Sequence, residues 1–591
     1  MTKQSTFRRL LGYMWRYKWI SLLALAFIFA TTLVTTALPL LARSYIDQFV
    51  SREAATNGLY LLVIYYGLFL LRVLLTFLGQ YAFARVAYSI VRDLRQETFA
   101  NMQQLGMAYF DQTAAGAIVS RLTNDTQSVA DMFSSIFSNF LSSILILVVT
   151  IATMLALNWR LTLLIVLFLP IMLGSIILYQ RLSNRLLKQV RARLSDLNVK
   201  LSESIEGMRI IQAFGQEKRL IEEFEAINRE HLDFSNRYLN VNSLFLRPAM
   251  SLLKILAYAL ILTYFGLSWQ VAGVTAGVMY AFIQYVNQLF NPLIDVMQNY
   301  SVLQTSMVAA ERVFELMDRR DFEPEQAEEG PEIQAGNIDF QHVNFSYDGK
   351  REILKDISFS VKQGETIAFV GSTGSGKSSI INLFLRFYEF EKGRILIDGR
   401  DIRDYSQAEL RRNIGLVLQD PFLYHGSISS NIRMYQESLS QAEVEEAARF
   451  VDAHDFISQL PQGYDSPVTE RGSTFSSGQR QLLAFARTIA TKPKILILDE
   501  ATANIDSETE ELIQHSLRKM RQGRTTIAIA HRLSTIQDAN CIYVLDKGRI
   551  IESGSHEELL VQNGHTRKCI SCRLECWISD RVREIKKVVG Q

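Results

Sequence analysis

Long apolar stretches dominate the first half of this 591-residue chain. Six of them can each cross a bilayer as a helix, at about residues 19–41, 59–80, 136–157, 161–179, 252–269 and 271–290. Helices buried in a soluble protein seldom run this far without charged residues. The pattern therefore predicts a six-helix, all-α transmembrane domain over residues 1–320, and buried helices of a large soluble domain are the alternative interpretation.

The polar segments 81–135 and 180–251 are too long for simple turns between spans and are compatible with helix. The second to fifth membrane helices are therefore expected to continue well into the cytoplasm and return, with short crossing segments at the tips. Basic residues gather before the first span and after the fourth, at Arg8, Arg9, Arg16, Lys18, Arg181, Arg185, Lys188, Arg191, Arg193 and Lys200. This bias predicts a multi-pass protein of the cell inner (plasma) membrane with both termini in the cytoplasm.

The composition changes after the last span. Residues 321–336, DFEPEQAEEGPEIQAG, are acidic and contain proline and glycine, which predicts a linker. Residues 337–564 alternate apolar strands with helices and are predicted to form an α/β P-loop domain that binds ATP. The net charge of +2 gives no support to a nucleic-acid partner, and none is expected.

A phosphate-binding loop is the most informative motif. It follows an apolar strand at 366–370 and consists of Gly371, Ser372, Thr373, Gly374, Ser375, Gly376, Lys377 and Ser378. Glycines let backbone N–H groups turn towards phosphates, Lys377 supplies a positive charge to the outer phosphates, and the Ser378 hydroxyl can bind Mg²⁺. An ordinary glycine-rich turn is the alternative, but the strand before the loop and the apolar helix after it favour a nucleotide site.

Two further strands in this domain end in residues suited to phosphate chemistry. The apolar run at 494–498 ends in Asp499 and Glu500, and the run at 525–530 ends in His531. Asp499 can hold Mg²⁺ through water, Glu500 can orient or deprotonate the attacking water, and His531 can donate a hydrogen bond to the γ-phosphate. A structural carboxylate pair and a merely packed histidine are the alternatives.

Taken in order, these motifs resemble an ABC exporter half-transporter, in which one membrane domain is fused to one nucleotide-binding domain. The resemblance extends from about residue 7 to 564. In the cassette it rests on Tyr347, the phosphate loop, Gln419 in LVLQDPFL, FSSGQRQ at 475–481, Asp499-Glu500, Asp506 and His531. In the membrane half it rests on Phe110-Asp111, Ser120-Arg121-Leu122, Asp125, Glu203, Gly207 and Ile211-Gln-Ala-Phe214.

The resemblance implies roles for residues that the motifs alone do not assign. Tyr347 would stack on adenine, and Gln419 would sense Mg²⁺ and the attacking water. Residues 211–214 would form the apolar contact of the membrane half with a cassette. The remaining implied nucleotide contacts are Ser379, Asp506 and the helix-starting residues Ser476, Ser477, Gly478 and Gln479, which would face phosphate across a domain dimer. One chain would then hold half of each ATP site.

The signature segment departs from the usual family sequence L-S-G-G-Q. Phe475 replaces the leucine, and Ser477 adds a side chain where backbone should approach phosphate. The phosphate loop, Glu500 and His531 are nevertheless complete. The combination resembles the subunit of heterodimeric bacterial multidrug ABC exporters that bears the catalytic carboxylate, and it favours a second half-transporter as partner. A homodimer that tolerates Ser477 is the alternative.

ATP-driven export of amphiphilic small molecules, either drugs or lipid-like compounds, is therefore the predicted function, with ATP and Mg²⁺ as cofactors. Three alternatives remain: an ATP-gated channel or sensor that does not pump, a peptide exporter, and a soluble-type ABC ATPase acting on DNA. The six spans oppose the last of these. Glu500 and His531 favour turnover over gating, and the absence of an added protease-like or binding domain weakens the peptide exporter.

Gln284, Asn287, Gln288 and Asn291 recur on one helical face of the sixth span. They predict either a stripe that lines a substrate path or hydrogen bonds between helices, and the sequence does not separate the two.

The tail at 565–591 is atypical. It contains Cys569, Cys572 and Cys576, an incomplete zinc site unless His565 joins them. The family resemblance stops after about Gly564, and this raises the hypothesis that the end of the chain is frameshifted or otherwise altered.

Overall fold

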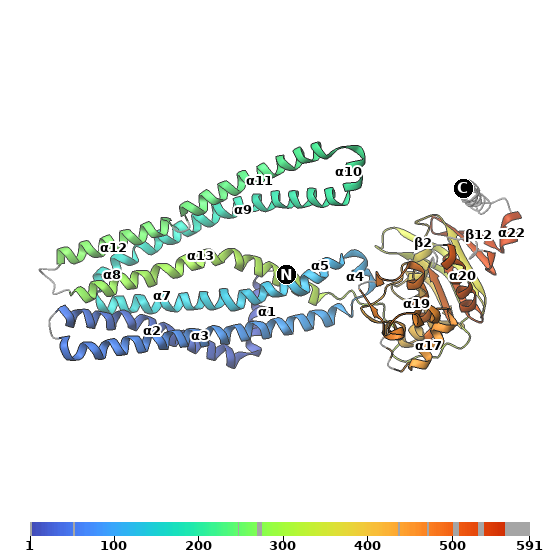
Figure 1. Cartoon of the computed structure of the whole chain (residues 1–591), viewed down its shortest axis with the longest axis horizontal. Coiled ribbons are helices and arrows are strands. Elements are labelled where there is room, and N and C mark those ends of the chain that lie inside the picture. The colour runs from blue at the N-terminus through green and yellow to red at the C-terminus, as the bar shows by residue number, and fades with distance from the viewer. Residues whose placement is uncertain are drawn as a thin grey trace. The chain divides into compact units, whose positions relative to one another are not determined.

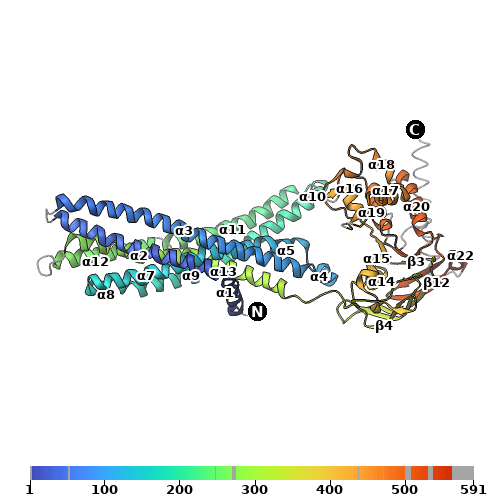
Figure 2. The same cartoon turned by 90° about the horizontal axis from the view of Figure 1, so that it is seen from below.

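The computed structural model describes residues 3–50, 54–245, 248–268, 275–434, 436, 438–469, 472–499, 507–529 and 537–561. Its contacts divide the chain into two compact units. The membrane unit comprises residues 1–103 and 113–319, and the cassette unit comprises Gln104–Gln112 together with the chain from Arg320 onward. A short piece between the second and third spans thus packs with the ATP-binding part of the chain. Figures 1 and 2 show the elements of each unit.

Helices are the regular secondary structure of the membrane unit in the part that is described. Its helices are α1 (Lys3–Arg16), α2 (Lys18–Val50), α3 (Ala54–Met102), α5 (Ala115–Ser120), α6 (Thr126–Asp131), α7 (Ser138–Leu157), α8 (Trp159–Val166), α9 (Phe168–Glu206), α10 (Met208–Phe214), α11 (Glu217–Phe245), α12 (Pro248–Ser268) and α13 (Ala276–Asp318), with π-helical turns at Arg121–Asp125 and Met132–Phe137.

The predicted membrane spans fall on these helices. Five helical stretches of the described chain are long and apolar enough to cross a membrane: Lys18–Gln48, Leu59–Met102, Ala115–Leu157, Trp159–Glu206 and Glu217–Gly266. The described part of the sixth predicted span lies in α13, and residues 269–274 are outside the described residues. The prediction of a helical transmembrane domain with about six spans is confirmed.

The predicted extensions of the spans are present as continuous helices. α3 has 49 residues and α9 has 39. At 1.5 Å per residue α3 is about 70 Å long, more than twice the thickness of a bilayer core. Figures 1 and 2 show α9 and α11 side by side, joined at their tip by α10. α10 ends at Gly215, whose φ of 61° gives the left-handed C-terminal cap that glycine favours.

The described part of the cassette unit contains a six-stranded mixed sheet, a four-stranded antiparallel sheet and a two-stranded sheet of β7 and β8. The six-stranded sheet has the order β12-β11-β3-β10-β9-β6, and the four-stranded sheet has the order β2-β1-β4-β5. The strands are β1 (Ile338–Ser346), β2 (Glu352–Val361), β3 (Thr366–Gly371), β4 (Lys392–Ile397), β5 (Arg400–Asp401), β6 (Ile414–Val417), β7 (Gly426–Ser427), β8 (Pro467–Val468), β9 (Ile495–Asp499), β10 (Thr525–Ile529), β11 (Cys541–Asp546) and β12 (Arg549–Gly554).

The cassette unit also contains helices and short turns. They are α4 (Met107–Gln112), α14 (Lys377–Phe384), a 3₁₀ turn at Ile402–Asp404, α15 (Gln407–Asn413), α16 (Ile428–Arg433), α17 (Gln441–Phe450), α18 (His454–Ser458), a 3₁₀ turn at Gly463–Asp465, α19 (Ser477–Ala490), α20 (Ser507–Arg521) and α22 (His556–Val561).

The central strands explain why the apolar runs of the sequence become a parallel sheet. β3, β9 and β10 are mostly apolar and mostly buried, as strands covered on both faces must be. β3 lies between β10 and β11, both parallel to it. The phosphate loop therefore begins at the carboxyl end of a central strand, which is where open α/β sheets bind ligands. The predicted α/β class of this region is confirmed.

Candidate nucleotide-binding site

The phosphate loop has the geometry of a tight backbone turn. Gly376 has φ of 108°, and a Cβ there would lie 2.7 Å from Leu354 Cδ2. A Cβ on Gly371 would lie 2.3 Å from the carbonyl oxygen of Leu545 on the neighbouring strand β11. Glycine is required at Gly376 because of its positive φ, and at Gly371 because the backbone of β11 lies too close for a Cβ. α14 begins at Lys377, at the end of the loop motif, so the N–H groups of its first turn face the glycines of the loop.

Two polar side chains in the loop fit a phosphate ligand. The Lys377 side chain is largely buried, and its Nζ donates to the carbonyl oxygens of Gly371 and Ser372, 3.0 Å from each. The hydroxyl of Ser375 is buried and has no hydrogen-bond partner among the described residues. Buried polar atoms normally have partners. An anion held in the loop would supply an acceptor to both side chains.

Tyr347 lies next to this loop. Its hydroxyl donates to Ser379 Oγ on α14, at 3.1 Å. Its ring packs edge-on against Phe345 and Tyr388, with centroid distances of 4.6 and 4.8 Å. The residue is still 42% exposed. The ring is thus fixed by its neighbours and open on the remaining side, as stacking on a base requires.

Strand register brings Asp499 and Gln419 to the edge of the sheet that carries the loop. Asp499 pairs with Ile529 of β10, which pairs with Phe369 of β3, so Asp499 is level with a position just before the loop. β6 pairs in parallel with β9, ending at Val417, and the exposed Gln419 follows two residues later. Glu500, Asp506 and His531 lie outside the described residues, so their predicted roles stay predictions.

The signature segment begins a helix, as predicted. Ser476 caps α19: its Oγ accepts from Gln479 N at 3.2 Å, while Gln479 Oε1 accepts from Ser476 N at 3.1 Å. This is a capping box, which fixes the first turn of the helix. Phe475 is 8% exposed and packs in the apolar core of the helical part of the cassette. An apolar anchor is therefore kept where the family has leucine, and Ser477 is the departure at a position for which a phosphate contact is predicted.

Sequence reasoning missed how firmly residues 321–336 are held on the cassette. Glu323 accepts two hydrogen bonds from Arg411, at 2.9 and 2.7 Å, and the Gln326 amide donates to the carbonyl oxygens of Ile402 and Tyr405. Further along, Asp398 accepts from the backbone N–H groups of residues 334–337. These carboxylate and amide contacts join residues far apart in sequence. Composition alone gave no signal for them.

The fold and this site define a class of protein: a P-loop ATPase cassette on the same chain as a multi-helix membrane unit. Comparison with known proteins gives the family. Residues 21–293 match the ABC transporter transmembrane region, and residues 354–503 match the ABC transporter domain.

Relatives match along nearly the whole chain. A Streptococcus pneumoniae serotype 4 protein, exp8, named as an ABC transporter ATP-binding protein, is 62% identical over 95% of this chain and 96% of its own length. The "Probable multidrug resistance ABC transporter ATP-binding/permease protein YheH" of Bacillus subtilis (strain 168) is 42% identical, over 89% of this chain and 78% of its own length. A solved bacterial Atm1-family ABC exporter with ATP bound superposes with a TM-score of 0.76 at 30% identity, covering 94% of this chain and 98% of that one.

The chain belongs to the ABC transporter family, as an exporter half-transporter that carries one membrane domain and one ATP-binding cassette. Its cassette binds ATP and makes the protein an ATPase coupled to transport. Exporters of this family work as dimers in a membrane. The predicted family, fold class and enzyme class are confirmed.

Proposed function

We propose that this half-transporter exports amphiphilic small molecules, drugs or lipid-like compounds, across the cytoplasmic membrane by alternating access, with its termini and cassette in the cytoplasm. The observation that carries the proposal is the buried Ser375 hydroxyl, which finds no partner in the described part of the chain and lies in a glycine loop at the N-terminus of α14, on a chain with five described membrane-length helices. The multidrug resistance named for YheH supports the cargo class.

Each residue of the site has its own role in ATP hydrolysis. Lys377 and the loop N–H groups bind the phosphates, and Tyr347 stacks on adenine. Ser378, Asp499 and Gln419 would hold Mg²⁺, which would neutralise phosphate charge when bound. Glu500 takes a proton from the attacking water, and His531 donates a hydrogen bond to the γ-phosphate. The predicted Ser379, Asp506 and Ser476–Gln479 contacts complete the site, the signature residues acting on the partner's nucleotide.

The tip of the second cytoplasmic hairpin is suited to receive motion from a cassette. None of the α10 side chains is buried, and Ile210 and Phe214 are 66% and 72% exposed. Large apolar side chains gathered in this way mark an interaction surface. We assign residues 211–214 to contact with a cassette of the dimer, so that closure of two cassettes on ATP biases the membrane helices between their two states.

Glu500→Gln tests hydrolysis. The amide keeps the size of the side chain but loses its basicity, so ATPase activity and dye export should nearly vanish while ATP binding persists. The matched control is Glu446→Gln, an exposed change on α17. Hydrolysis above about a tenth of the parent rate would remove Glu500 from the catalytic role. Export that survives without hydrolysis would instead favour an ATP-gated channel.

The partner is best explained as a second, different half-transporter. Ser477 puts a side chain at the phosphate-facing start of α19, while the loop at 371–378 is complete. This chain would then supply the catalytic residues of the competent site, and its partner would supply the good signature and carry a weakened catalytic carboxylate.

Drug-stimulated ATPase activity of the purified subunit in nanodiscs tests the heterodimer. Activity should appear only with a co-expressed half-transporter. Robust turnover and transport by this subunit alone would show a homodimer. Ser477→Gly is the companion variant, and in a heterodimer it should increase activity at the impaired site rather than at the competent one.

A further inference from the structure

The helix α14, which begins at the phosphate loop, ends in a cap with an arginine at its centre. Arg386 N donates to the Leu383 carbonyl oxygen and Phe387 N donates to the Asn382 carbonyl oxygen, both at 3.0 Å, and Arg386 has φ of 58°. This is the Schellman arrangement, in which glycine normally takes the left-handed position. Another residue persists there only where its surroundings fix it. Contacts outside the helix must therefore hold the turn at 386–390, RFYEF.

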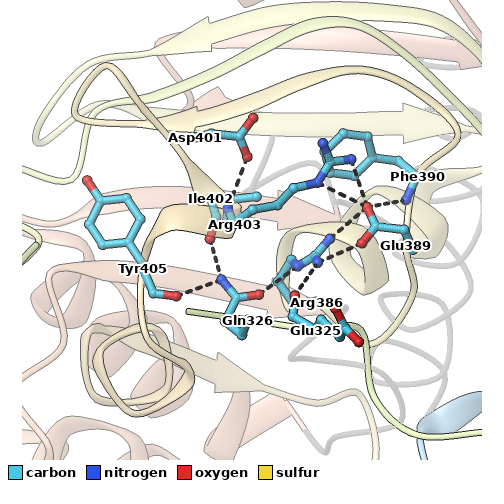
Figure 3. A network of polar contacts seen from close by, with 9 residues as sticks. All are labelled: Glu325, Gln326, Arg386, Glu389, Phe390, Asp401, Ile402, Arg403 and Tyr405. Atoms are coloured by element: carbon cyan, nitrogen blue, oxygen red, sulfur yellow. Dashed lines mark hydrogen bonds and ion pairs between the residues drawn. The ribbon is translucent and has the colours of Figure 1, made fainter. Parts of the chain in front are cut away.

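The linker supplies the first of these contacts, as Figure 3 shows. The Arg386 side chain is 3% exposed. Its Nε donates to Gln326 Oε1 at 3.0 Å, and its Nη2 donates to the Glu325 carbonyl oxygen at 3.2 Å. The Gln326 amide in turn donates to the carbonyl oxygens of Ile402 and Tyr405. One linker side chain thus joins the turn to a neighbouring segment of the cassette.

Glu389 and Phe390 provide further contacts that hold the turn. Glu389 accepts from Arg386 and Arg403, at 2.7 and 2.8 Å. Burial opposes its charge, but the hydrogen bonds from the two guanidinium groups outweigh it and lower the pKa of Glu389. The Phe390 ring is buried, and the guanidinium carbon of Arg403 lies 4.1 Å from its centroid. The turn therefore has one fixed conformation.

Tyr388 lies on this turn and packs against the residue assigned to adenine stacking. Its ring meets that of Tyr347 edge-on, with centroids 4.8 Å apart and ring planes at 88°. Tyr388 and Tyr347 also pack edge-on against Phe345, with centroid distances of 5.8 and 4.6 Å. The Tyr388 hydroxyl donates to a carboxylate oxygen of Asp111 on α4, a contact separate from this packing. Edge-to-face pairs are a favoured geometry, so the three rings fix one another's orientation.

The Tyr347 hydroxyl is held by α14. It donates to Ser379 Oγ at 3.1 Å and accepts from Asn382 Nδ2 at 3.3 Å. Tyr347 is nevertheless 42% exposed, directly after β1. An exposed side chain that binds a base loses rotational freedom on binding, and contacts that fix it beforehand remove that cost. Fixing this ring in advance should therefore increase the affinity for a base that stacks on it.

We propose that Tyr388 and the linker residue Gln326 are positioning residues for the base of ATP. Gln326 holds Arg386, Arg386 fixes the turn at 386–390, and Tyr388 on this turn keeps the Tyr347 ring in its stacking orientation. The linker thereby contributes to nucleotide affinity. Stacking needs only an aromatic face, so guanine should be affected as adenine is. The proposal rests on the proposed stacking of Tyr347 on adenine.

Equilibrium binding to the full chain in nanodiscs, with its partner subunit where one is required, tests the proposal. The Kd of labelled ATP, the Kd of labelled GTP and the inhibition constant of inorganic tripolyphosphate are measured in EDTA, so that ATP is not hydrolysed. Gln326→Ala and Tyr388→Leu should each raise both Kd values about three- to tenfold. The constant for tripolyphosphate, which has no base, should stay at the parental value. Tyr388→Phe keeps the ring and should restore the parental Kd values.

Two matched changes serve as controls. Gln334→Ala is the same substitution on an exposed side chain of the linker. Tyr464→Leu removes a ring that packs in the helical part of the cassette. Both should leave all three constants at the parental values. If Tyr388→Leu does not fold, Asn382→Ala takes its place, because it removes a hydrogen bond to the Tyr347 hydroxyl and should also raise both Kd values.

The possible outcomes separate the positioning role from general damage to the site. Unchanged Kd values in Gln326→Ala and Tyr388→Leu would overturn the proposal. A tripolyphosphate constant that rises together with the Kd values would also overturn it, because the phosphate loop itself would then be disturbed. Tyr347→Ala tests the underlying assignment. If it leaves the Kd of ATP unchanged, Tyr347 does not stack on the base; if it raises the Kd while Gln326→Ala and Tyr388→Leu do not, stacking stands and the positioning role fails.

Discussion

Polar side chains are used differently in the two units. In α2, the hydroxyls of Thr31, Thr32 and Thr36 donate to carbonyl oxygens one turn earlier in the same helix, at 2.8 to 3.0 Å. In the cassette, Arg487 of α19 donates to the Phe422 carbonyl oxygen and to the backbone and side chain of Asn431, at 2.9 to 3.0 Å. The first pattern gives these three hydroxyls no part in joining α2 to another helix, although Tyr285 and Gln288 of α13 do donate to carbonyl oxygens of α2. The second pattern fixes distant loops to one another.

This difference suggests that the two units have different roles. A helix whose polar groups are satisfied within itself can change its neighbours without leaving buried groups unpaired. A site for phosphate chemistry needs donors already held in place, and long-range hydrogen bonds supply that order. Movement is therefore expected in the membrane unit and precise chemistry in the cassette. Substitutions should accordingly have their largest effects on activity in the cassette.

The largest expected effect is that of Lys377→Ala. The side chain is buried against the loop carbonyls and supplies the positive charge for the phosphates, so its loss should weaken ATP binding at least about tenfold. Titration of the purified transporter with a fluorescent ATP analogue measures this. Lys362→Ala, an exposed change on the same domain, is the control. Normal ATP affinity in Lys377→Ala would show that the loop is not the cradle.

The second largest effect should be on the stability of the membrane unit, at an ion pair that joins two of its segments. Asp125 is 9% exposed in its side chain and accepts two hydrogen bonds from Arg312 of α13, at 2.8 and 2.5 Å. Arg312→Leu leaves the carboxylate unpaired and should cost about 2–3 kcal/mol, less than for a fully buried pair because Arg312 is half exposed. Thermal unfolding of the full chain in nanodiscs measures the loss.

The comparison for this pair comes from an exposed pair at the C-terminal end of the same helix, where Arg319 directly follows α13. Arg319→Leu breaks the contact with Glu315, at 3.4 Å between exposed groups, and should cost at most about 0.5 kcal/mol. Arg312→Leu combined with Asp125→Leu should recover most of the stability, because no unpaired charge remains. A double variant as unstable as Arg312→Leu alone would show that the ion pair is not the cause.

The contrast between contacts within one segment and contacts between distant segments also explains which features could be predicted from the sequence. The phosphate loop was predictable because strand, glycines, lysine and helix stand next to one another, and the structure has β3, the loop and α14 in that order. The membrane helices were predictable from length and apolarity. The Tyr388–Asp111 contact was not, because it joins residues 277 positions apart whose side chains have no periodic pattern. The domain boundaries at 320, 336 and 564 stay predictions, as does the interpretation of the tail, which lies outside the described residues.

The smallest effect should separate the two interpretations of the polar stripe on α13. Gln288 donates to the Thr35 carbonyl oxygen at 3.0 Å and accepts from Thr150 at 3.3 Å, so it connects three helices. Asn291, on the same helical face, has an exposed side chain. Hydrogen bonds between membrane helices contribute about 0.6 kcal/mol on average. Gln288→Leu should therefore lower stability by about that amount and leave the KM for export of an amphiphilic dye unchanged, whereas Asn291→Leu should change the KM and not the stability. If Gln288→Leu alters the KM as much as Asn291→Leu does, Gln288 faces the substrate and the stripe lines its path. Polar side chains of the membrane unit would then be held in place for a ligand, as those of the cassette are.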